Sequence, residues 1–485
     1  MAIFTQLHSQ KMKVNTRSFI VIGIIIFLCA LLGILGRPLS FLATLWVANA
    51  VLLGVFLRYP NFLNVGGWLG SFTGYMAADL ITGNDFTLTL FLTLANMANV
   101  FVSLIIIKSF RLDYTQYNKG LTFLYLFLLN AFGGCLVGAL FAVSTIPYVP
   151  NTFMQLDRIW TDFGMWWTGE ILNIITFLPI ILALPSKKII QQYYKKIKQQ
   201  PFQIKQVLPL CAVIISVVFA HFFIGPGSIM FPIAALIWAS LSYNLFYVTI
   251  INCFVVTFLY TSLSAFYIAE SSDAYLATAI SIRIGLFMLA LGPLTLSIIS
   301  LNRQKLYHQI LYLANHDSLT TTLNRRFFYE ESERVVASSS NKKIAESISI
   351  LLLDLDHFKK INDLYGHHIG DFVLQNFTTI VKSNLRNQDL FGRLGGEEFA
   401  ILLKNLSLQQ SIQIAERICD AVYNTPILLE NGECISISVS IGLSHQTMPH
   451  YVPFQQLINR ADHALYQAKE KGRNQLCVDY NLGMI

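Results

Sequence analysis

The chain has 485 residues, of which 54% are hydrophobic and only 13% are charged, and its formal net charge is +7. Soluble globular domains carry about 25% charged residues, so the composition excludes a chain that is soluble throughout and predicts a large membrane part. Much of the positive excess lies in short loops between apolar segments, where it sets membrane orientation. We therefore expect no nucleic acid polymer as a partner.

Ten apolar segments precede residue 301, and a helix that crosses a membrane needs about 20 such residues. They are residues 17–36, 39–57, 62–82, 86–107, 121–144, 163–184, 206–224, 227–243, 246–268 and 276–300. The eighth is short and the third is rich in glycine, so we expect eight to ten spans. The sequence thus predicts a polytopic α-helical membrane domain over residues 1–300, in contact with membrane lipids and without a cleavable signal.

The charged residues between the segments sort to two sides if the N-terminus is placed in the cytoplasm. The loops that ten spans leave inside are basic, with Arg58, Lys108, Arg111, Lys119, Lys187, Lys188, Lys195, Lys196, Lys198, Lys205, Arg303 and Lys305. The outer loops are mainly acidic, with Asp85, Asp157, Asp162, Glu270 and Asp273 beside Arg37 and Arg158. Cytoplasmic loops are enriched in Lys and Arg. We therefore expect the N-terminus and the C-terminal domain to be cytoplasmic.

Five polar residues lie within or near the expected spans, namely Asn49, Asp79, Glu170, His221 and Arg283. A charge in hydrocarbon is costly, so such residues usually face the interior of a helix bundle or a cavity. For Asp79 and Glu170 two alternatives stay open, a ligand pocket and packing between helices. For His221, which is near the end of a span, packing is favoured.

The second apolar segment carries a short family resemblance. Residues 45–54 read Leu-Trp-Val-Ala-Asn-Ala-Val-Leu-Leu-Gly, and Leu57-Arg58 follow them. This stretch is similar to the start of bacterial MASE (membrane-associated sensor) domains of the first type. The resemblance would cover most of residues 17–300. It implies a sensory role, with an unidentified stimulus, in the inner membrane of a bacterium.

Residues 301–316 are predicted to continue the last span as a linker helix. Ile299, Leu306, Ile310 and Leu313 follow one another at spacings of seven, four and three. This is the pattern of a helix that can pair with a second copy of itself. A plain connector helix is the alternative.

Beyond residue 317 the apolar pattern alternates between helical and extended periods. Helices are predicted over 325–337, 369–385, 408–422 and 454–470, and strands over 348–353, 389–394, 398–403 and 435–443. The two middle strands flank a Gly-Gly pair and are predicted to form a hairpin. Residues 317–480 are therefore expected to form an α/β domain with a central, mainly antiparallel sheet.

Two acidic motifs stand where strands are predicted to end. Asp354 ends the strand 348–353, and Asp356 follows two residues later and points to the same side. The second motif, Gly395-Gly396-Glu397-Glu398-Phe399, lies at the hairpin tip, where two glycines let a flat ligand approach the backbone. Alone, the first could be a solvated strand end and the second a mere turn. Together they suggest a Mg²⁺ site for phosphoryl transfer, since Mg²⁺ takes carboxylates and substrate phosphates as ligands.

Over about residues 313–480 these motifs resemble the GGDEF family of diguanylate cyclases, whose domain is similar to nucleotidyl cyclases and polymerase palms. Further matches, in family order, are Asp317, Leu319, Thr320, 324–326, 362–363, 366–367, 370–371, 440–442, 461–469 and 472–474. The resemblance implies a nucleotidyltransferase that joins two GTP molecules into cyclic di-GMP and releases pyrophosphate. It also implies a homodimer, because each domain would hold one GTP.

The resemblance assigns a role to each matching residue. The ligands of two Mg²⁺ or Mn²⁺ ions would be Asp354, Glu397 and the carbonyl of Leu355, and the catalytic acidic residues would be Glu397 and Glu398. The residues that bind GTP would be Asn362 and Asp371 at the guanine, Gly395 and Gly396 at the tip, and Lys469 and Arg473 at the phosphates. A spacing of four would place Lys469 and Arg473 on one face of a helix.

A third motif, Arg386-Asn387-Gln388-Asp389, lies nine residues before the hairpin tip. It matches the RxxD site at which the product, cyclic di-GMP, inhibits members of the family. Arg386 could bind guanine or phosphate and Asp389 could accept from a guanine edge, while Arg417 falls where the family often supplies a second arginine.

The start of the domain departs from the family pattern. Ser318 stands where the family usually has proline, and Thr321-Thr322-Leu323 stands where it usually has Gly-Leu-Pro. We expect a looser turn there and retained activity.

Three other functions are weighed against a cyclase. A domain that binds GTP or cyclic di-GMP without catalysis is disfavoured by the intact Gly395–Phe399, Asp354 and Lys469. A transporter with a regulatory tail would be supported by inverted repeats, and none is found. An adenylyl-type cyclase or a polymerase is disfavoured by Asn362 and Asp371.

Overall fold

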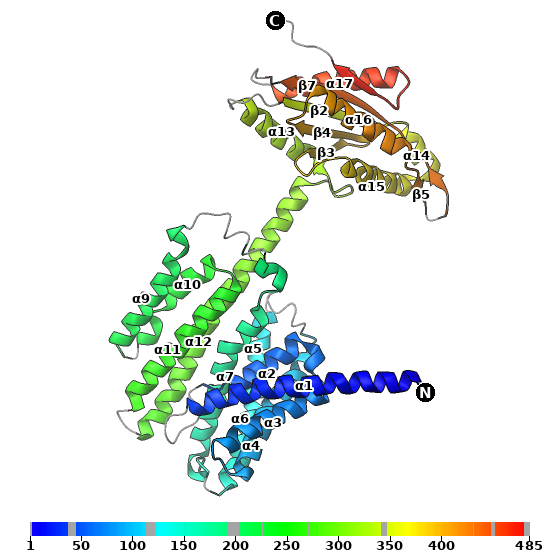
Figure 1. Ribbon diagram of the computed structural model, residues 1–485. Helices are drawn as coiled ribbons and strands as arrows, with labels where there is room; N and C mark the ends of the chain where they lie inside the picture. Colours follow the sequence, from blue (N-terminus) through cyan, green and yellow to red (C-terminus); the bar gives the residue numbers. More distant parts are fainter. Residues whose placement is uncertain are drawn as a thin grey trace. The chain divides into compact units, whose positions relative to one another are not determined.

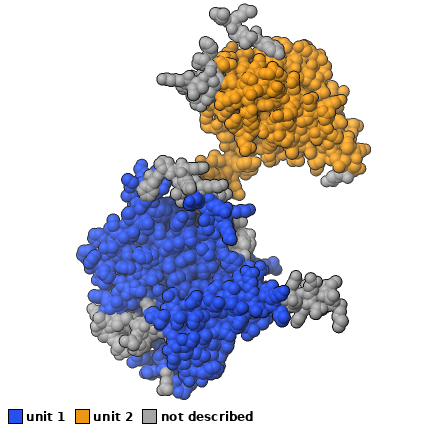
Figure 2. Space-filling model, viewed as in Figure 1, with its two compact units in different colours: residues 1–305 blue, residues 306–485 orange. Residues whose placement is uncertain are grey.

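The computed structural model describes residues 2–36, 45–112, 122–150, 152–191, 194, 203–225, 227–268, 272–340, 347–429, 431–447 and 452–479. The chain divides into two compact units, residues 1–305 and 306–485 (Figure 2). The part of the second expected span before Leu45 lies outside the described residues.

The first unit is built from α-helices (Figure 1). They are α1 Ala2–Leu35, α2 Val47–Arg58, α3 Val65–Ile81, α4 Phe86–Ser109, α5 Thr122–Phe132, α6 Gly134–Thr145, α7 Ile159–Ala183, α9 Leu208–Phe222, α10 Ile233–Ser242, α11 Leu245–Ile268 and α12 Ser272–Asn315. Each expected span falls on one of these helices, except that residues 121–144 are divided between α5 and α6. The polytopic helical domain predicted from the sequence is thus confirmed as an architecture.

Within the described ranges, six helical segments are long and apolar enough to cross a membrane. These are Met12–Leu35, Phe86–Ser109, Thr122–Tyr148, Leu156–Ala183, Leu245–Phe266 and Ala277–Asn315. Three other apolar helices, Val47–Arg58, Leu208–Phe222 and Ser228–Ser242, are shorter. At about 1.5 Å per residue they fall short of a hydrocarbon layer about 30 Å thick. Among the described residues six segments thus meet the length and composition of a span, and the eight to ten spans stay a prediction.

The glycines of the third expected span have a packing role. A Cβ on Gly70 would lie 2.4 Å from the carbonyl oxygen of Phe19, and one on Gly74 would lie 2.7 Å from that of Gly23. Gly66, four residues earlier, meets the backbone of Asn15 in the same way. Small residues at this spacing let two helices approach closely in a membrane. The glycine stripe of α3 therefore packs against α1.

The second unit contains a six-stranded sheet in the order β1-β3-β4-β2-β7-β8. Its strands are β1 Leu323–Asn324, β2 Ser347–Leu355, β3 Leu390–Gly395, β4 Glu398–Lys404, β7 Val439–Thr447 and β8 Leu476–Asp479, and β5 Ile427–Leu428 pairs separately with β6 Cys434–Ile435. The inner pairs are antiparallel, whereas β1 and β8 join the edges in parallel. The predicted mainly antiparallel sheet is confirmed.

Helices cover both faces of this sheet (Figure 1). They are α13 Arg325–Ser340, α14 Phe358–Tyr365, α15 His367–Ser383, α16 Leu408–Tyr423 and α17 Phe454–Glu470. Strand β2 alternates between two cores: Leu351, Leu353 and Leu355 pack with α15 and α16, while Ile350 and Leu352 pack with α13 and α17. Burial on both faces explains why this strand is a continuous apolar run.

Two elements differ from the prediction. A separate helix, α14, precedes α15, and the two are divided at Gly366, whose φ of +82° favours glycine. The strand expected over 435–443 is interrupted, because β6 ends at Ile435 and β7 begins at Val439. The periodicity of Ile435, Ile437, Val439 and Ile441 does not reveal this break, since all four are buried.

Candidate active site

Asp354 is the last residue but one of the central strand β2. It lies opposite Glu398 of β4 and Ser440 of β7. The ammonium group of Lys469, on α17, lies 2.7 Å from Asp354 Oδ2. Burial raises the pKa of Asp354, Lys469 lowers it, and the charges of Glu397 and Glu398 raise it. Three carboxylates and one cation thus act on one another at the end of the sheet.

The hairpin tip between β3 and β4 lies beside this strand end. The amide of Leu355 donates to the carbonyl oxygen of Glu397 at 3.3 Å. Gly396 has a φ of +49°, and a Cβ on either Gly395 or Gly396 would meet open space. Asp354, Leu355 and Glu397, which sequence analysis assigned to metal binding, are therefore neighbours beneath an open tip.

The donor set fits a divalent cation that shares its ligands with a nucleotide. Among the residues that the structure describes, no three His, Cys, Asp or Glu side chains form a group able to hold a metal ion by themselves. Two carboxylates alone do not complete the coordination of a metal ion. Mg²⁺, however, usually takes one or two protein carboxylates, and waters and substrate phosphates supply its other ligands. Lys469 offsets part of the negative charge of Asp354, Glu397 and Glu398, and a divalent cation would offset more of it.

Asp356 has a different role from the one its spacing suggested. Its Oδ1 accepts from the Ser440 hydroxyl at 2.7 Å, and its Oδ2 accepts from the Ser438 hydroxyl at 2.7 Å and from the amide of Asn474 at 3.0 Å. The residue is 5% exposed. A buried carboxylate with three donors holds β7 and the segment before β8 against β2, so Asp356 is structural and only Asp354 faces the site.

The two residues expected to read guanine come together at the start of α15. Asn362 lies on α14, and a Cβ on Gly370 would come within 1.9 Å of Asn362 Oδ1. Only a glycine at position 370 leaves room for this amide, and Asp371 is the next residue along the chain. The side chain of Asn362 is half-buried and that of Asp371 is exposed.

The two residues expected to hold phosphates do not lie on one helix as predicted. Lys469 is in the last turn of α17, which ends at Glu470, whereas Arg473 has a φ of +65° in the turn that follows. The prediction that both lie on one helical face is therefore wrong. The turn forms because the amide of Arg473 donates to the carbonyl oxygen of Ala468 and that of Asn474 donates to Asp356.

The RxxD motif forms a tight turn before β3. The amide of Arg386 donates to Asp389 Oδ2 at 2.9 Å, while Asp389 Oδ1 is buried and has no hydrogen-bond partner. Burial raises the pKa of Asp389, and the amide and charge of Arg386 lower it. Arg417, on α16, donates to the carbonyl oxygen of Asn384 at 2.7 Å, so it lies beside the same loop.

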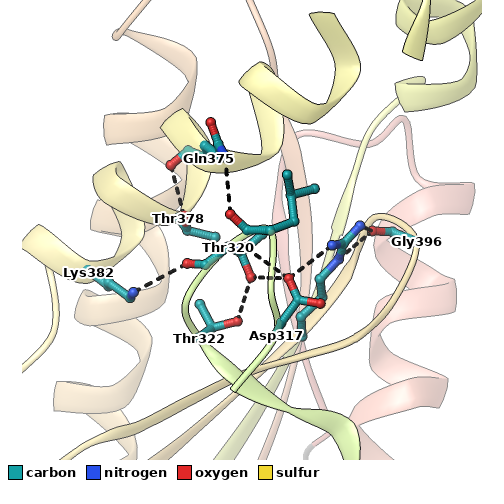
Figure 3. Close-up of polar contacts among 9 residues, drawn as sticks. Asp317, Thr320, Thr322, Gln375, Thr378, Lys382 and Gly396 are labelled. Carbon is teal, nitrogen blue, oxygen red and sulfur yellow. Dashed lines mark hydrogen bonds and ion pairs between the residues drawn. The ribbon is translucent and has the colours of Figure 1, made fainter. Parts of the chain in front are cut away.

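The turn at the start of the domain is closely hydrogen-bonded (Figure 3). Asp317 Oδ1 accepts from the amide and the hydroxyl of Thr320 and from Arg393, at 2.9, 2.7 and 3.0 Å. The hydroxyl of Thr322 lies 2.9 Å from that of Thr320, and Lys382 donates to the carbonyl oxygen of Thr321 at 3.2 Å. Threonine hydroxyls and Lys382 supply hydrogen bonds to a turn that lacks the family's glycine and prolines, and Thr321 has a left-handed φ of +55°.

Arg393 is a residue that sequence analysis did not single out. Besides its ion pair with Asp317, it donates from Nε and from its terminal nitrogen to the carbonyl oxygen of Gly396, at 2.9 and 2.7 Å. It therefore ties the opening turn to the hairpin tip, and Asp317 of the turn and Gly396 of the tip are labelled in Figure 3. The one available signal was a cation two residues before the Gly-Gly pair, on a strand that is otherwise apolar.

Comparisons with known proteins agree with this geometry. The profile of the family described as "Diguanylate cyclase, GGDEF domain" matches residues 314–475. A probable diguanylate cyclase, DgcF, from Escherichia coli O157:H7 is 27% identical over 442 residues, which cover 89% of this chain and 88% of that protein.

Two solved structures are also similar to the second half of the chain. The GGDEF domain of YfiN (TpbB) from Pseudomonas aeruginosa is 37% identical and covers 34% of this chain and 94% of its own, with a TM-score of 0.32. The coiled coil and GGDEF domain of DgcB from Caulobacter crescentus, in complex with c-di-GMP, is 28% identical and covers 38% and 95%, with a TM-score of 0.35.

A mainly antiparallel sheet with carboxylates at the end of its central strand, a glycine hairpin and a lysine above them defines a nucleotidyl-transfer domain of the palm type. Its matches along residues 314–475 are specific to one such group. Residues 314–475 are a GGDEF domain of the diguanylate cyclase type. The activity of the chain is therefore the synthesis of cyclic di-GMP, and its N-terminal helices are compatible with a multi-pass membrane protein.

Proposed function

We propose that the chain joins two GTP molecules into cyclic di-GMP at the site formed by Asp354 and Glu397, on the cytoplasmic side of a bacterial inner membrane. The observation that carries the proposal is the convergence of Asp354, Glu397 and Lys469 beside an open glycine tip. Competing carboxylates need a cation, and the open tip leaves room for a nucleotide.

Asp354, Glu397 and the carbonyl of Leu355 would hold the divalent cations, two Mg²⁺ or Mn²⁺ ions per site. Such ions, when bound, polarise an α-phosphate and lower the pKa of an attacking hydroxyl. Glu398 adds negative charge at the edge of the site. Lys469, which pairs with Asp354, would also contact the phosphates, and Arg473 would reach them from the turn after α17.

Asn362 and Asp371 would select GTP. A carboxylate accepts from the N1–H and N2 amino donors of guanine, and adenine lacks that arrangement of donors. The contact between Asn362 and Gly370 fixes one of the two groups before any base arrives. Groups that are placed in advance discriminate strongly, because the wrong base leaves them unpaired.

The reaction requires two domains. In it, the 3′-hydroxyl of each GTP attacks the α-phosphate of the other, two pyrophosphates leave, and one cyclic product remains. Since each domain would hold one GTP, the active species would be a homodimer with its two sites face to face. Positioning and charge stabilisation would account for most of the rate.

Product inhibition would act through Arg386, Asp389 and Arg417. The unpartnered Oδ1 of Asp389 is an acceptor for a guanine edge, and the two arginines lie on adjacent segments. Bound product would hold the two domains apart in an inactive arrangement.

A catalytically inactive module that only senses GTP or cyclic di-GMP is the alternative. The deciding experiment incubates the fragment 301–485, which contains both cores of the second unit, with GTP and Mg²⁺ and measures cyclic di-GMP by mass spectrometry. Formation of product supports the cyclase. Binding of GTP without product at any protein concentration would support the alternative.

A further inference from the structure

An open groove lies in the first unit where α2 and α4 end and α3 begins. It has a volume of about 360 Å³, and its walls come from the end of α2, the turn that follows it, the start of α3 and the end of α4. Ten of the eleven described residues that line it are apolar, and the eleventh is Lys108. The groove is therefore an apolar surface with a single cation among its lining residues.

Close packing fixes the wall that α2 and α3 form. A Cβ on Gly67 would lie 2.0 Å from the carbonyl oxygen of Phe62, so the turn after α2 packs directly on α3. The ring centroid of Trp68 lies 5.1 Å from that of Phe56 and 5.8 Å from that of Phe101. Trp68, on α3, thus contacts aromatic rings of both α2 and α4 inside the groove.

Apolar side chains stay uncovered on the other wall. Leu63, Phe101 and Ile105 are 42%, 53% and 47% exposed, whereas Phe56 and Ile107, which also line the groove, are buried. Helix α4 is one of the described segments that are long and apolar enough to cross a membrane. In a bilayer its uncovered side chains would contact acyl chains. A concave surface makes more van der Waals contacts with such a chain than a flat one does.

Two hydrogen-bond donors add a polar end to this apolar surface. Lys108 is exposed in the last turn of α4, and Arg111 is the next cation along the chain. No described residue forms an ion pair with Lys108, and none accepts from the indole N–H of Trp68. No acidic side chain is among the described residues that line the groove. The polar end therefore attracts an anion.

The place of these donors on a span indicates what kind of anion. Lysines near the ends of spanning helices reach the level of the lipid headgroups, and tryptophans are enriched there. Basic residues just outside a span attract anionic lipids. An amphiphile with a hydrocarbon chain and a negative headgroup matches both parts of the groove.

We propose that the groove binds one anionic glycerophospholipid. One of its acyl chains lies against Phe101 and Ile105. Its phosphate accepts from the ammonium group of Lys108 and from the indole N–H of Trp68. A lipid with a choline headgroup fits less well, because its positive charge would stand beside Lys108. The bound lipid would stabilise the region where α2, α3 and α4 meet, and the inference does not depend on the cyclase reaction.

The test measures quenching of tryptophan fluorescence in full-length protein in detergent micelles. Phosphatidylglycerol with brominated acyl chains is titrated, and phosphatidylcholine with the same chains is the comparison. The signal is the quenching that the wild type shows in excess of Trp68→Phe, since that difference comes from the indole in the groove. We expect half-quenching at an about fivefold lower mole fraction of phosphatidylglycerol, the effect of one lysine beside an anionic lipid. Equal mole fractions for the two lipids, or no excess over Trp68→Phe, would overturn the proposal.

A matched set of lysine variants locates the headgroup. Lys205, in the turn before α9, is exposed and does not line the groove. Lys108→Gln should abolish the preference for phosphatidylglycerol, whereas Lys108→Arg and Lys205→Gln should keep it. Each variant is compared with its own Trp68→Phe counterpart, and the midpoint of thermal unfolding establishes that it is folded.

Two outcomes of this comparison contradict the assignment. One is a preference for phosphatidylglycerol that survives in folded Lys108→Gln. The other is a preference that Lys205→Gln loses as well, which would indicate attraction to the total charge of the protein. If Lys108→Gln does not yield folded protein, Lys108→Ala serves in its place, with the same expected loss.

Discussion

At the scale of single residues, we propose that the chemistry depends on Asp354 and Glu397, and an acid on another element serves as the control. We expect Asp354→Asn or Glu397→Gln to lower the rate of cyclic di-GMP formation about 100-fold or more, because each removes a group that holds charge during the reaction. Asp420→Asn, an exposed acid on α16, should keep wild-type rates. Circular dichroism establishes that each variant is folded. Near-normal turnover in a folded Asp354→Asn variant would remove that residue from the site.

We propose that base selection depends on Asp371 and Asn362. Asp371→Ala should lower kcat/KM for GTP by at least about tenfold, the value of one lost hydrogen bond to a charged group. The wild type should show no ATP turnover comparable to GTP turnover. The measurement is product formation from each nucleotide at matched concentrations. Equal use of ATP and GTP by the wild type would show that these residues do not read the base.

Product inhibition provides a separate test at the RxxD turn. Arg386→Ala should raise the concentration of cyclic di-GMP needed for half-inhibition at least tenfold, since the arginine is expected to bind guanine or phosphate. Initial rates should change little because Arg386 is not at the metal site. Arg334→Ala, an exposed arginine on α13, is the control. Identical inhibition curves for Arg386→Ala and wild type would place the inhibitory site elsewhere.

At the scale of elements, the opening turn and the hairpin tip are joined through Asp317 and Arg393. Burial raises the pKa of Asp317, but hydrogen bonds from Thr320 and Arg393 outweigh it, so the net pKa is below the usual 3.8. A depressed carboxyl pKa contributes stability above the ordinary pKa, and this contribution is lost as the pH falls through the lowered value. Asp317→Asn in the fragment 301–485 should therefore lower the free energy of unfolding at pH 7 and have a smaller effect at pH 3.

A double-mutant cycle with Arg393→Gln identifies the partner. If the ion pair carries the effect, the loss for the double variant will be smaller than the sum of the two single losses. Urea unfolding at both pH values gives the four free energies. Strict additivity would show that Asp317 acts only through the threonine hydroxyls of its own turn.

The sequence predicts those elements that burial of apolar residues determines, and it misses those that a single backbone conformation or a distant partner determines. The period of apolar residues reveals β2, α16 and α17, because burial alone places them. It cannot separate α14 from α15, where a single left-handed glycine decides, nor show that Arg473 follows the end of α17. The partners of Asp356 and Arg393 lie on strands distant in the chain, so their roles become visible only when the sheet is assembled.

At the scale of the whole molecule, one helix belongs to both the membrane unit and the catalytic unit. Helix α12 runs from Ser272 to Asn315 without a break. The residues predicted to form a seam are exposed along it, with Ile299 at 54%, Leu306 at 58%, Ile310 at 55% and Leu313 at 69%. An exposed apolar stripe along a helix favours pairing with a second copy. We therefore expect this stripe to be a dimer seam that sets the phase of the two catalytic units.

Insertions after Leu306 test this phase. Two alanines turn the helix beyond them by about 200°, whereas seven residues turn it by only about 20°, at 3.6 residues per turn. If the seam positions two Glu397-centred sites toward each other, the two-residue insertion should depress cyclic di-GMP synthesis by full-length protein in membranes, and the seven-residue insertion should largely restore it. Expression is matched by immunoblot, and the fragment 301–485 gives the activity without the membrane unit. Equal activity of both insertions and wild type would show that residues 301–316 are a flexible tether and that the catalytic units pair by themselves.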